Sequence, residues 1–269
     1  MKQGLGSQFG RALPLYLTGE HHCSYLAGVR ARTLFVDPGA RIDGATYQRL
    51  IDQGFRRSGT HIYRPACCGC SACIPVRLPV DAFVPNRSQR RNWRRNAPDI
   101  ALSDGPAVFR AEQFELYRRY LAARHANGVM AEDASEDSYR RFLVASWGGM
   151  TRFLEFRLDG RLVGVAVTDV LEQGLSAVYT FFDPDLAARA LGTFSVLNQI
   201  RLTQLLGRPY LYLGYWIAES RKMVYKERFR PIEAWDGRDW RRFERGQTLG
   251  FDDRRSSLTL DSSSRANRP

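Results

Sequence analysis

The second half of the chain carries the pattern that most restricts the fold. EQFELYRRYLAARH and SEDSYRRFLVASW read as amphipathic helices, and the second begins with the N-cap Ser135 and acidic residues. TRFLEFRL and RLVGVAVTDV flank the turn Asp159-Gly160, which predicts a β-hairpin. Strands are predicted at Leu175–Pro184 and over YLYLGYW, and a long helix is predicted between them at Phe194–Gly207. A last helix is predicted near SRKMVYKERF. This order suits a mixed α/β architecture, and we expect an α+β fold with a mixed sheet.

The first hundred residues have a different texture. They are rich in Gly, Pro, Arg and Cys, with a strand-like piece at Thr33–Val36 and a helix predicted at Ala45–Phe55. The change falls near Ser103–Ala107. We therefore expect a small Cys/Arg-rich N-terminal domain over residues 1–104 and a second domain over residues 105–251. A disordered tail is expected over residues 252–269, where large apolar side chains are scarce.

The composition is that of a folded protein, with 44% hydrophobic and 12% aromatic residues. No run approaches the roughly 18–20 apolar residues that a membrane span needs, and the longest candidate is Pro209–Ala218. The first residues show no secretory signal pattern. We expect a cytoplasmic protein without a membrane partner.

The positive charge is concentrated in the N-terminal third. The formal net charge is +12, and residues 1–98 hold 15 Lys and Arg against 5 Asp and Glu. The segment RSQRRNWRRN places a tryptophan among arginines, which grip phosphate, while an aromatic ring can stack on an unpaired base. A solvated basic face or an anionic membrane surface is the alternative. The expected contacts to nucleic acid are Arg87, Arg90, Arg91, Arg94 and Arg95.

Several long motifs resemble one enzyme family. They are CSYLAGVRARTLFVDP, GFRRSGTHIYRPACCGCSACIPVRLPVDAFVPNRSQRR, LSAVYTFFDPD and YLYLGYWIAESRKMVYKERFRPIE. In this order they resemble the bacterial aminoacyl-tRNA–protein transferases of the N-degron pathway, and most closely the branch that transfers leucine to N-terminal Asp or Glu. The resemblance implies an N-terminal family domain, a GNAT-like transferase domain, and aminoacyl-tRNA and protein N-termini as partners. Arginine as the transferred residue remains the alternative.

The chemistry of such a transfer is undemanding. The ester on tRNA is already activated, and an α-amino group with a pKa of about 7.7–8.0 is partly neutral in the cytosol. Positioning and oxyanion stabilisation therefore suffice, and no cofactor is required. Recognition of an acidic N-terminal side chain calls for a buried or partly buried arginine.

Polar residues of the second half are the candidates for catalysis. Lys222 and Lys226 stand four positions apart, so a helix would present both on one face. They would hold the acceptor end of tRNA or stabilise charge in the transition state. The alternative is a solvated basic face with tyrosines in the core. Asp183 is interpreted as a turn residue. The full catalytic set is Tyr179, Tyr215, Lys222, Tyr225 and Lys226.

Arginines flank the cysteine segment in GFRRSG, YRP and PVR. One of them could read the acidic side chain of the acceptor. Phosphate binding, or structural pairing with Asp37 or Asp81, competes with that role. The candidates are Arg56, Arg57, Arg64 and Arg77.

Four of the five cysteines lie in YRPACCGCSACIPVR, at residues 63–77. A tetrahedral thiolate site needs four ligands, so Cys23 or His22 would have to complete the set. Cys23 and Cys67-Cys68 resemble two cysteine pairs that bind metal or an iron–sulfur cluster in eukaryotic members, but Leu26 replaces one member. A metal-free loop and a nucleophilic cysteine are the alternatives. A zinc or iron–sulfur site would use Cys23, Cys67, Cys68, Cys70 and Cys73.

Two other functional classes are compatible with parts of the sequence. A peptidoglycan-type aminoacyl-tRNA ligase shares the transfer chemistry, but the basic cysteine-bearing domain fits it poorly. A non-enzymatic, metal-dependent RNA-binding protein would explain the charge and the cysteines. It leaves YWIAESRKMVYKERF without a role.

Overall fold

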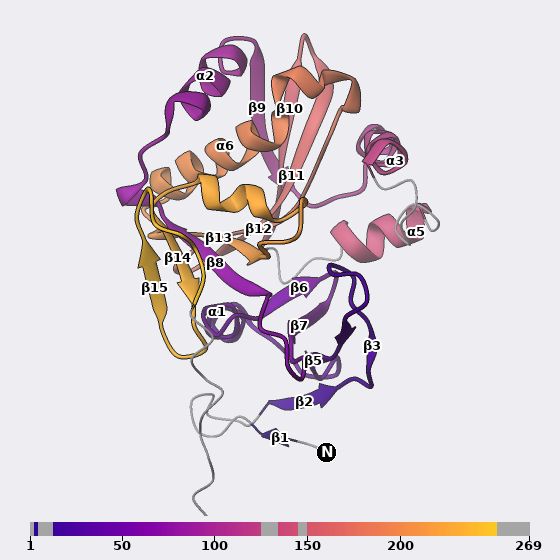
Figure 1. Ribbon diagram of the computed structural model, residues 1–269. Coiled ribbons are helices and arrows are strands. Elements are labelled where there is room, and N and C mark those ends of the chain that lie inside the picture. The colour runs from indigo at the N-terminus through magenta and orange to yellow at the C-terminus, as the bar shows by residue number, and fades with distance from the viewer. Residues whose placement is uncertain (1–2, 5–12, 125–133, 145–149, 252–269) are drawn as a thin grey trace, which may run out of the picture.

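Two sheets of different size organise the protein. The computed structural model describes residues 3–4, 13–124, 134–144 and 150–251 (Figure 1). The smaller sheet contains β1 (Gln3–Gly4), β2 (Pro14–Leu17), β5 (Thr33–Val36), β6 (Arg56–Ser58) and β7 (His61–Pro65). Their order is β1-β2-β5-β7-β6, and β3 (His21–His22) pairs separately with β4 (Arg30–Ala31).

The larger sheet has eight strands. They are β8 (Ile74–Pro79), β9 (Ile100–Pro106), β10 (Thr151–Leu158), β11 (Arg161–Leu171), β12 (Gly174–Phe182), β13 (Tyr210–Trp216), β14 (Ile232–Trp235) and β15 (Trp240–Phe243). Their order is β15-β14-β8-β13-β12-β11-β10-β9. Only the β12–β13 pair is parallel, so the sheet is mixed and the expected α+β class is confirmed.

Helices cover both sheets (Figure 1). The α-helices are α1 (Gly44–Asp52), α2 (Arg87–Asn96), α3 (Ala111–Arg124), α5 (Glu136–Tyr139) and α6 (Leu191–Leu205). The short helical segments are η1 (Val80–Ala82), η2 (Arg140–Val144), η3 (Pro184–Arg189) and η4 (Val224–Arg228). Among the described residues, none of the helices is both long and apolar enough to cross a bilayer.

Strand β11 shows how the core forms. Residues 162–169 are all buried, because helices cover both faces of the sheet at this strand. Val165 belongs to the apolar cluster under α3, whereas Ala166 belongs to the cluster with Phe194 of α6. Each large apolar side chain buried in this way contributes about 1.5–3 kcal/mol to folding.

Most elements of the second half confirm the sequence-based prediction. β10 and β11 form the hairpin, and both turn residues adopt the positive φ that the turn needs, 50° at Asp159 and 81° at Gly160. Helix α6 and strands β12 and β13 lie within a few residues of their predicted positions. Asp183 is a turn residue, because its carboxylate accepts the backbone N–H of Asp185 at 3.1 Å.

The last predicted helix is wrong. The segment near SRKMVYKERF contains only the five-residue 3₁₀ turn η4, and Lys222 lies before it. Lys222 and Lys226 therefore do not share a helical face. Lys222 is exposed, whereas Lys226 is buried.

The large sheet takes strands from both sides of residue 104. β8 and β9 come from the first 106 residues, yet β8 lies between β13 and β14 near the middle of the sheet. Apolar side chains of β8 sit in the same core cluster as those of β13. The two halves of the chain are thus joined through one sheet. The expected disordered tail, residues 252–269, lies outside the described residues.

Candidate active site

Strands β12 and β13 pair only where they begin. The parallel pairs are Gly174 with Tyr210, Leu175 with Leu211, and Ser176 with Tyr212. β12 continues to Phe182 and β13 to Trp216 without further pairing to each other, and we call the separation of their carboxyl ends the opening. Such separations at the carboxyl ends of parallel strands are common ligand-binding positions in open α/β sheets.

Arg56 of β6 reaches into this opening. Its Nη2 donates a hydrogen bond of 2.8 Å to the Ala177 carbonyl on β12. On the other side is Gly214 of β13, where a Cβ would lie 2.8 Å from the guanidinium carbon. The side chain is buried, and its Nη1 has no hydrogen-bond partner among the described residues. The opening therefore contains a buried cation with an unused donor.

Lys226 of η4 is a second buried cation near the opening. Its Nζ donates to the Tyr215 carbonyl and lies 3.2 Å from the Met223 sulfur. Burial lowers the pKa of Lys226 to about 7, and the positive charge of Arg56 contributes to the shift. The amine is therefore partly neutral near pH 7, which lets it accept a proton.

Tyr215 supports Lys226 more than it offers chemistry of its own. Its hydroxyl donates to the Gly54 carbonyl at 2.9 Å. Burial raises the pKa of Tyr215 well above its usual value, with a smaller contribution from Tyr63. The phenol therefore stays protonated and bound to the backbone. Tyr215 acts through its carbonyl, which holds Lys226.

Tyr179 lies on β12 within a cage of aromatic rings. Its ring centroid is 5.2 Å from Phe142, 6.2 Å from Tyr117 and 6.4 Å from Tyr120. The hydroxyl is buried and has no hydrogen-bond partner within the described part of the chain. Burial raises the pKa of Tyr179, so this side chain offers a protonated, unused donor in apolar surroundings.

Tyr225 lies close enough to Tyr120 and Arg56 for both to affect its pKa. Desolvation raises the pKa of Tyr225 to about 12, the Tyr120 phenol adds to the shift, and Arg56 opposes it. Tyr225 is 38% exposed, so it stands at the rim. The structure thus brings together Tyr179, Tyr215, Tyr225 and Lys226 of the predicted catalytic set. Lys222 is exposed.

Arg57 has a structural environment. Its Nε and Nη2 each donate to the carboxylate of Asp169 at 2.5 Å, and Nη2 also bonds the Thr151 hydroxyl. Both side chains of the ion pair are completely buried. The pair ties β6 of the small sheet to β11 of the large one, and the cation is already neutralised.

The other two candidate arginines, Arg77 and Arg64, differ in whether a carboxylate pairs with them. Arg77 donates to Glu233 at 2.7 Å and lies 3.4 Å from Asp52, so it is neutralised too. Arg64 of β7 lies over the ring of Phe55, with its guanidinium carbon 4.9 Å from the centroid. Burial lowers the pKa of Arg64, and among the described residues it has no carboxylate partner. Of the four candidates, Arg56 and Arg64 are the ones that the described carboxylates leave available to bind an acidic ligand.

Cys73 lies close enough to Lys226 and Tyr215 to affect their pKa values. Cys23 accepts the backbone N–H groups of Tyr25 and Leu26, each at 3.4 Å. Burial, together with the thiols of Cys23, Cys67 and Cys70, raises the pKa of Cys73 to about 12. Cys73 is therefore protonated at neutral pH and is a poor nucleophile.

A metal site at these thiols stays a prediction. All five cysteines are free, and Cys68 is exposed. Within the part of the chain that the structure describes, no three His, Cys, Asp or Glu side chains are grouped so that they could hold a metal ion. We therefore derive no chemical step through a metal or an iron–sulfur cluster.

Helix α2 presents its arginines to solvent. Asn86 and Gln89 form a capping box at its start. Trp93 packs against Phe194 at 5.5 Å between centroids, so this ring belongs to the side of α2 that faces α6. It is not interleaved with the exposed arginines for stacking on a base. The exposed set is Arg87, Arg90, Arg91, Arg94 and Arg95.

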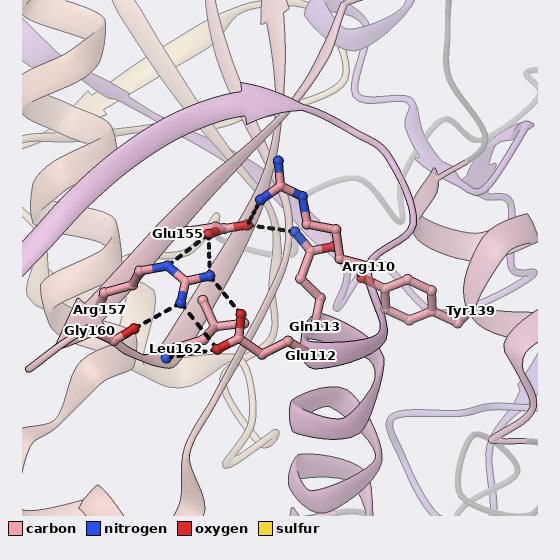
Figure 2. A network of polar contacts seen from close by, with 8 residues as sticks. All are labelled: Arg110, Glu112, Gln113, Tyr139, Glu155, Arg157, Gly160 and Leu162. Atoms are coloured by element: carbon pink, nitrogen blue, oxygen red, sulfur yellow. Dashed lines mark hydrogen bonds and ion pairs between the residues drawn. The ribbon is translucent and has the colours of Figure 1, made fainter.

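A polar network that sequence reasoning missed fixes α3 on the sheet. Glu155 of β10 accepts a hydrogen bond of 2.7 Å from Gln113 of α3 and is paired with Arg157 at 2.9 Å (Figure 2). Arg157 also pairs with Glu112 at 2.7 Å. Tyr120, farther along the same helix, lies beside Tyr179. No spacing in the sequence marks these long-range contacts.

Comparison with known proteins identifies the family. Two family models match in succession: "Arginine-tRNA-protein transferase, N terminus" over residues 21–91, and "Arginine-tRNA-protein transferase, C terminus" over residues 112–236. A Stenotrophomonas maltophilia (strain K279a) protein named "Aspartate/glutamate leucyltransferase" is 52% identical over 238 residues, covering 86% of this chain and 94% of that protein. The chain belongs to the aminoacyl-tRNA–protein transferase family. It is therefore an enzyme, and its substrates are an aminoacyl-tRNA and a protein.

A second relative of this transferase carries the same name, and one solved structure matches more weakly. A Chromohalobacter salexigens protein with the same name is 50% identical over 90% of this chain and 98% of its own length. A solved C-terminal domain of a putative lysylphosphatidylglycerol synthetase from Agrobacterium fabrum covers 66% of this chain and 53% of its own, with a TM-score of 0.41 and 14% identity. Family membership removes the cell-wall ligase and the non-enzymatic RNA-binding protein as interpretations of the sequence.

Proposed function

We propose that this transferase moves leucine from leucyl-tRNA to the N-terminal α-amino group of proteins that begin with Asp or Glu, and so marks them for degradation in the cytoplasm. Relatives about 50% identical carry the name aspartate/glutamate leucyltransferase. The observation that carries the proposal is Arg56, a buried guanidinium with an unused donor between β12 and β13.

Arg56 is suited to bind the acceptor's acidic side chain. A carboxylate would receive the free Nη1 donor and neutralise a buried charge. A neutral side chain would leave that donor and charge unpaired, which produces strong discrimination. Arg64, the other arginine without a carboxylate partner among the described residues, supplies a second positive charge near the site.

Lys226 is suited to take the proton that the reaction releases. The acceptor's α-amine attacks the ester carbonyl carbon, the new C–N bond forms, and the bond to the tRNA ribose oxygen breaks. The attacking nitrogen must lose a proton, and the ribose oxygen must gain one. A lysine with a pKa of about 7 is matched to an α-amine of about 7.7–8.0, so Lys226 can accept the first proton and return it.

The aromatic cage favours a leucyl donor. The rings that surround Tyr179 are those of Tyr117, Tyr120, Phe142 and Phe181, and all are neutral. An arginyl side chain would need a carboxylate partner to be buried among them, whereas a leucyl side chain would not. The unused Tyr179 hydroxyl is available to orient the aminoacyl group.

The remaining parts suit tRNA. The exposed arginines of α2 offer donors for the phosphate backbone. We assign the large mixed sheet with α3 and α6 to a GNAT-like transferase unit, and the cysteine-bearing small sheet to the family's N-terminal domain. The reaction as drawn uses no cofactor.

A transfer assay tests the proposal. Purified enzyme is incubated with leucyl-tRNA or arginyl-tRNA and with peptides that begin with Asp, Glu, Lys or Ala. We expect leucine on the Asp and Glu peptides only. Transfer of arginine in its place would overturn the donor assignment, and transfer to Ala or Lys peptides would overturn the role of Arg56.

A further inference from the structure

A cavity lies near the closed end of the β12–β13 pair. Its volume is about 450 Å³, and its lining includes Asp52, Arg77, Tyr210, Trp235 and Trp240. These residues come from α1, β8, β13 and the β14–β15 hairpin, which lies beside α1 (Figure 1). The proposed chemistry at the open end of the strands uses none of them.

Arg77 is held in this cavity between aromatic rings. Its guanidinium carbon lies 3.5 Å from the ring centroid of Tyr210 and 4.3 Å from that of Trp240. Nε donates to Glu233 and Nη1 to Asp52, while Nη2 has no hydrogen bond to the described residues. The result is a rigid wall of stacked planar groups with one donor to spare.

Trp235 is the ring that remains available. Its centroid is 5.7 Å from that of Trp240, whose indole N–H is already bonded to the Asp52 carbonyl at 2.9 Å. The indole N–H of Trp235 has no partner among the described residues. A flat ligand that enters the cavity would therefore meet an uncommitted aromatic side chain.

The charges of the cavity are nearly balanced. Arg77 is compensated by Glu233 and Asp52. Arg49, Gln53 and Gln173 add polar groups to the lining, so both donors and acceptors are present. Arg77, the cation stacked in the wall, already has two carboxylate partners here, whereas Arg56 has none among the described residues. A neutral, planar, hydrogen-bonding heterocycle suits this lining better.

We propose that this cavity, the nucleobase pocket, binds one unpaired base of the donor tRNA, stacked on Trp235. The proposal rests on the proposed function, which makes aminoacyl-tRNA the donor. Asp52 lines the pocket, and Arg56, four residues later, lies in the β12–β13 opening. An extended chain spans about 3.3–3.6 Å per residue, so the two sites are within reach of a short single strand. Arg77 then shapes the pocket for tRNA and does not read the acceptor.

Binding of deacylated tRNA to full-length variants tests the pocket. Trp235→Leu should raise the Kd about tenfold, because one stacked base no longer has its platform. The dependence of Kd on salt should keep its slope, because stacking releases no counterions. Trp235→Phe keeps a ring and should stay within about twofold of wild type. The matched control is Arg238→Gln, an exposed position in the same hairpin, which should leave the pocket intact.

A second measurement does not depend on the variants folding. Ultraviolet crosslinking of 4-thiouridine-labelled tRNA to the wild-type enzyme should modify a peptide that contains Trp235 or Trp240. No crosslink there, or an unchanged Kd in Trp235→Leu, overturns the pocket. A raised KM for the acceptor peptide with unchanged tRNA binding also overturns it and assigns the cavity to the protein substrate. Crosslinking without leucine transfer by the wild type would instead refute the proposed function and leave the pocket standing.

Discussion

Arg56 and Arg57 are neighbours in β6, yet they lie in opposite environments. Arg57 is buried against Asp169, with two hydrogen bonds of 2.5 Å and no exposed surface. Arg56 is buried between β12 and β13, and one of its donors has no partner among the described residues. A buried cation with its own carboxylate holds the fold together. A buried cation without a carboxylate partner raises the free energy of the unliganded enzyme. Binding of an anion removes this cost.

Disruption of the Arg57–Asp169 ion pair should cause the largest loss of stability. Asp169→Asn leaves the Arg57 charge buried and unpaired, which should lower the free energy of unfolding by about 3–5 kcal/mol. Urea denaturation measures the change. The double variant Arg57→Met with Asp169→Leu removes both charges and should recover most of the loss. If Asp169→Asn is as stable as wild type, the contrast between the two arginines fails.

Substitution of Lys226 should cause the largest loss of catalytic rate. Lys226→Met removes the proposed proton acceptor and should lower kcat/KM by about 100-fold or more. In the wild type kcat/KM should fall as the pH drops below about 7, because protonated Lys226 cannot accept a proton. Lys226→Met should lose that part of the profile, and only the titration of the acceptor amine should remain.

Stability provides an independent check on Lys226. Between pH 7 and 10.5 the unfolded chain keeps the lysine proton and the folded chain does not. The free energy of unfolding should therefore rise with pH across that interval. Lys226→Met should flatten the rise, and an unchanged rise would assign the low pKa to another group.

Arg56 should affect selectivity more than stability. Arg56→Gln should lower kcat/KM for Asp and Glu peptides by about 30-fold, the value of one hydrogen bond to a charged group. Its free energy of unfolding should stay level or rise, because a buried cation is removed. A loss as large as that of Asp169→Asn would mean that both arginines are structural.

The arginines of α2 should show the smallest effect per residue. Removing one arginine that binds a phosphate should reduce the slope of log Kd against log salt by about 0.9 and weaken tRNA binding a few-fold. Replacing Arg90 and Arg91 by Gln tests this with salt titrations. The selectivity for peptides that begin with Asp or Glu should not change, since α2 lies outside the opening. An unchanged slope would contradict the phosphate assignment.

The sequence predicts the local elements well and the long-range pairings poorly. Hydrophobic alternation and the Asp159-Gly160 turn define the β10–β11 hairpin because both signals are local. The motif order also identifies the family. The helix predicted near SRKMVYKERF is wrong because the polar spacing of this segment comes from the burial of Lys226, not from a helical face.

The sequence could not distinguish the roles of the four candidate arginines in the site. Arg56, Arg57, Arg64 and Arg77 look equivalent in their motifs. Their difference depends on Asp169 and Glu233, which lie more than a hundred residues away in the chain. The pairing of β8 with β13 could not be predicted either, because strands so far apart in the chain leave no local signal of their pairing.

Gly214 gives the redesign of this enzyme a specific starting point. A side chain at this position and the guanidinium of Arg56 would occupy the same space, because a Cβ there would lie 2.8 Å from the Arg56 side chain. The backbone is also left-handed at Gly214, with φ of 79°. An engineer who shortens Arg56 to admit neutral N-termini will open a void against Gly214. Residue 214 cannot fill it without strain, so the filling group must come from the new acceptor itself.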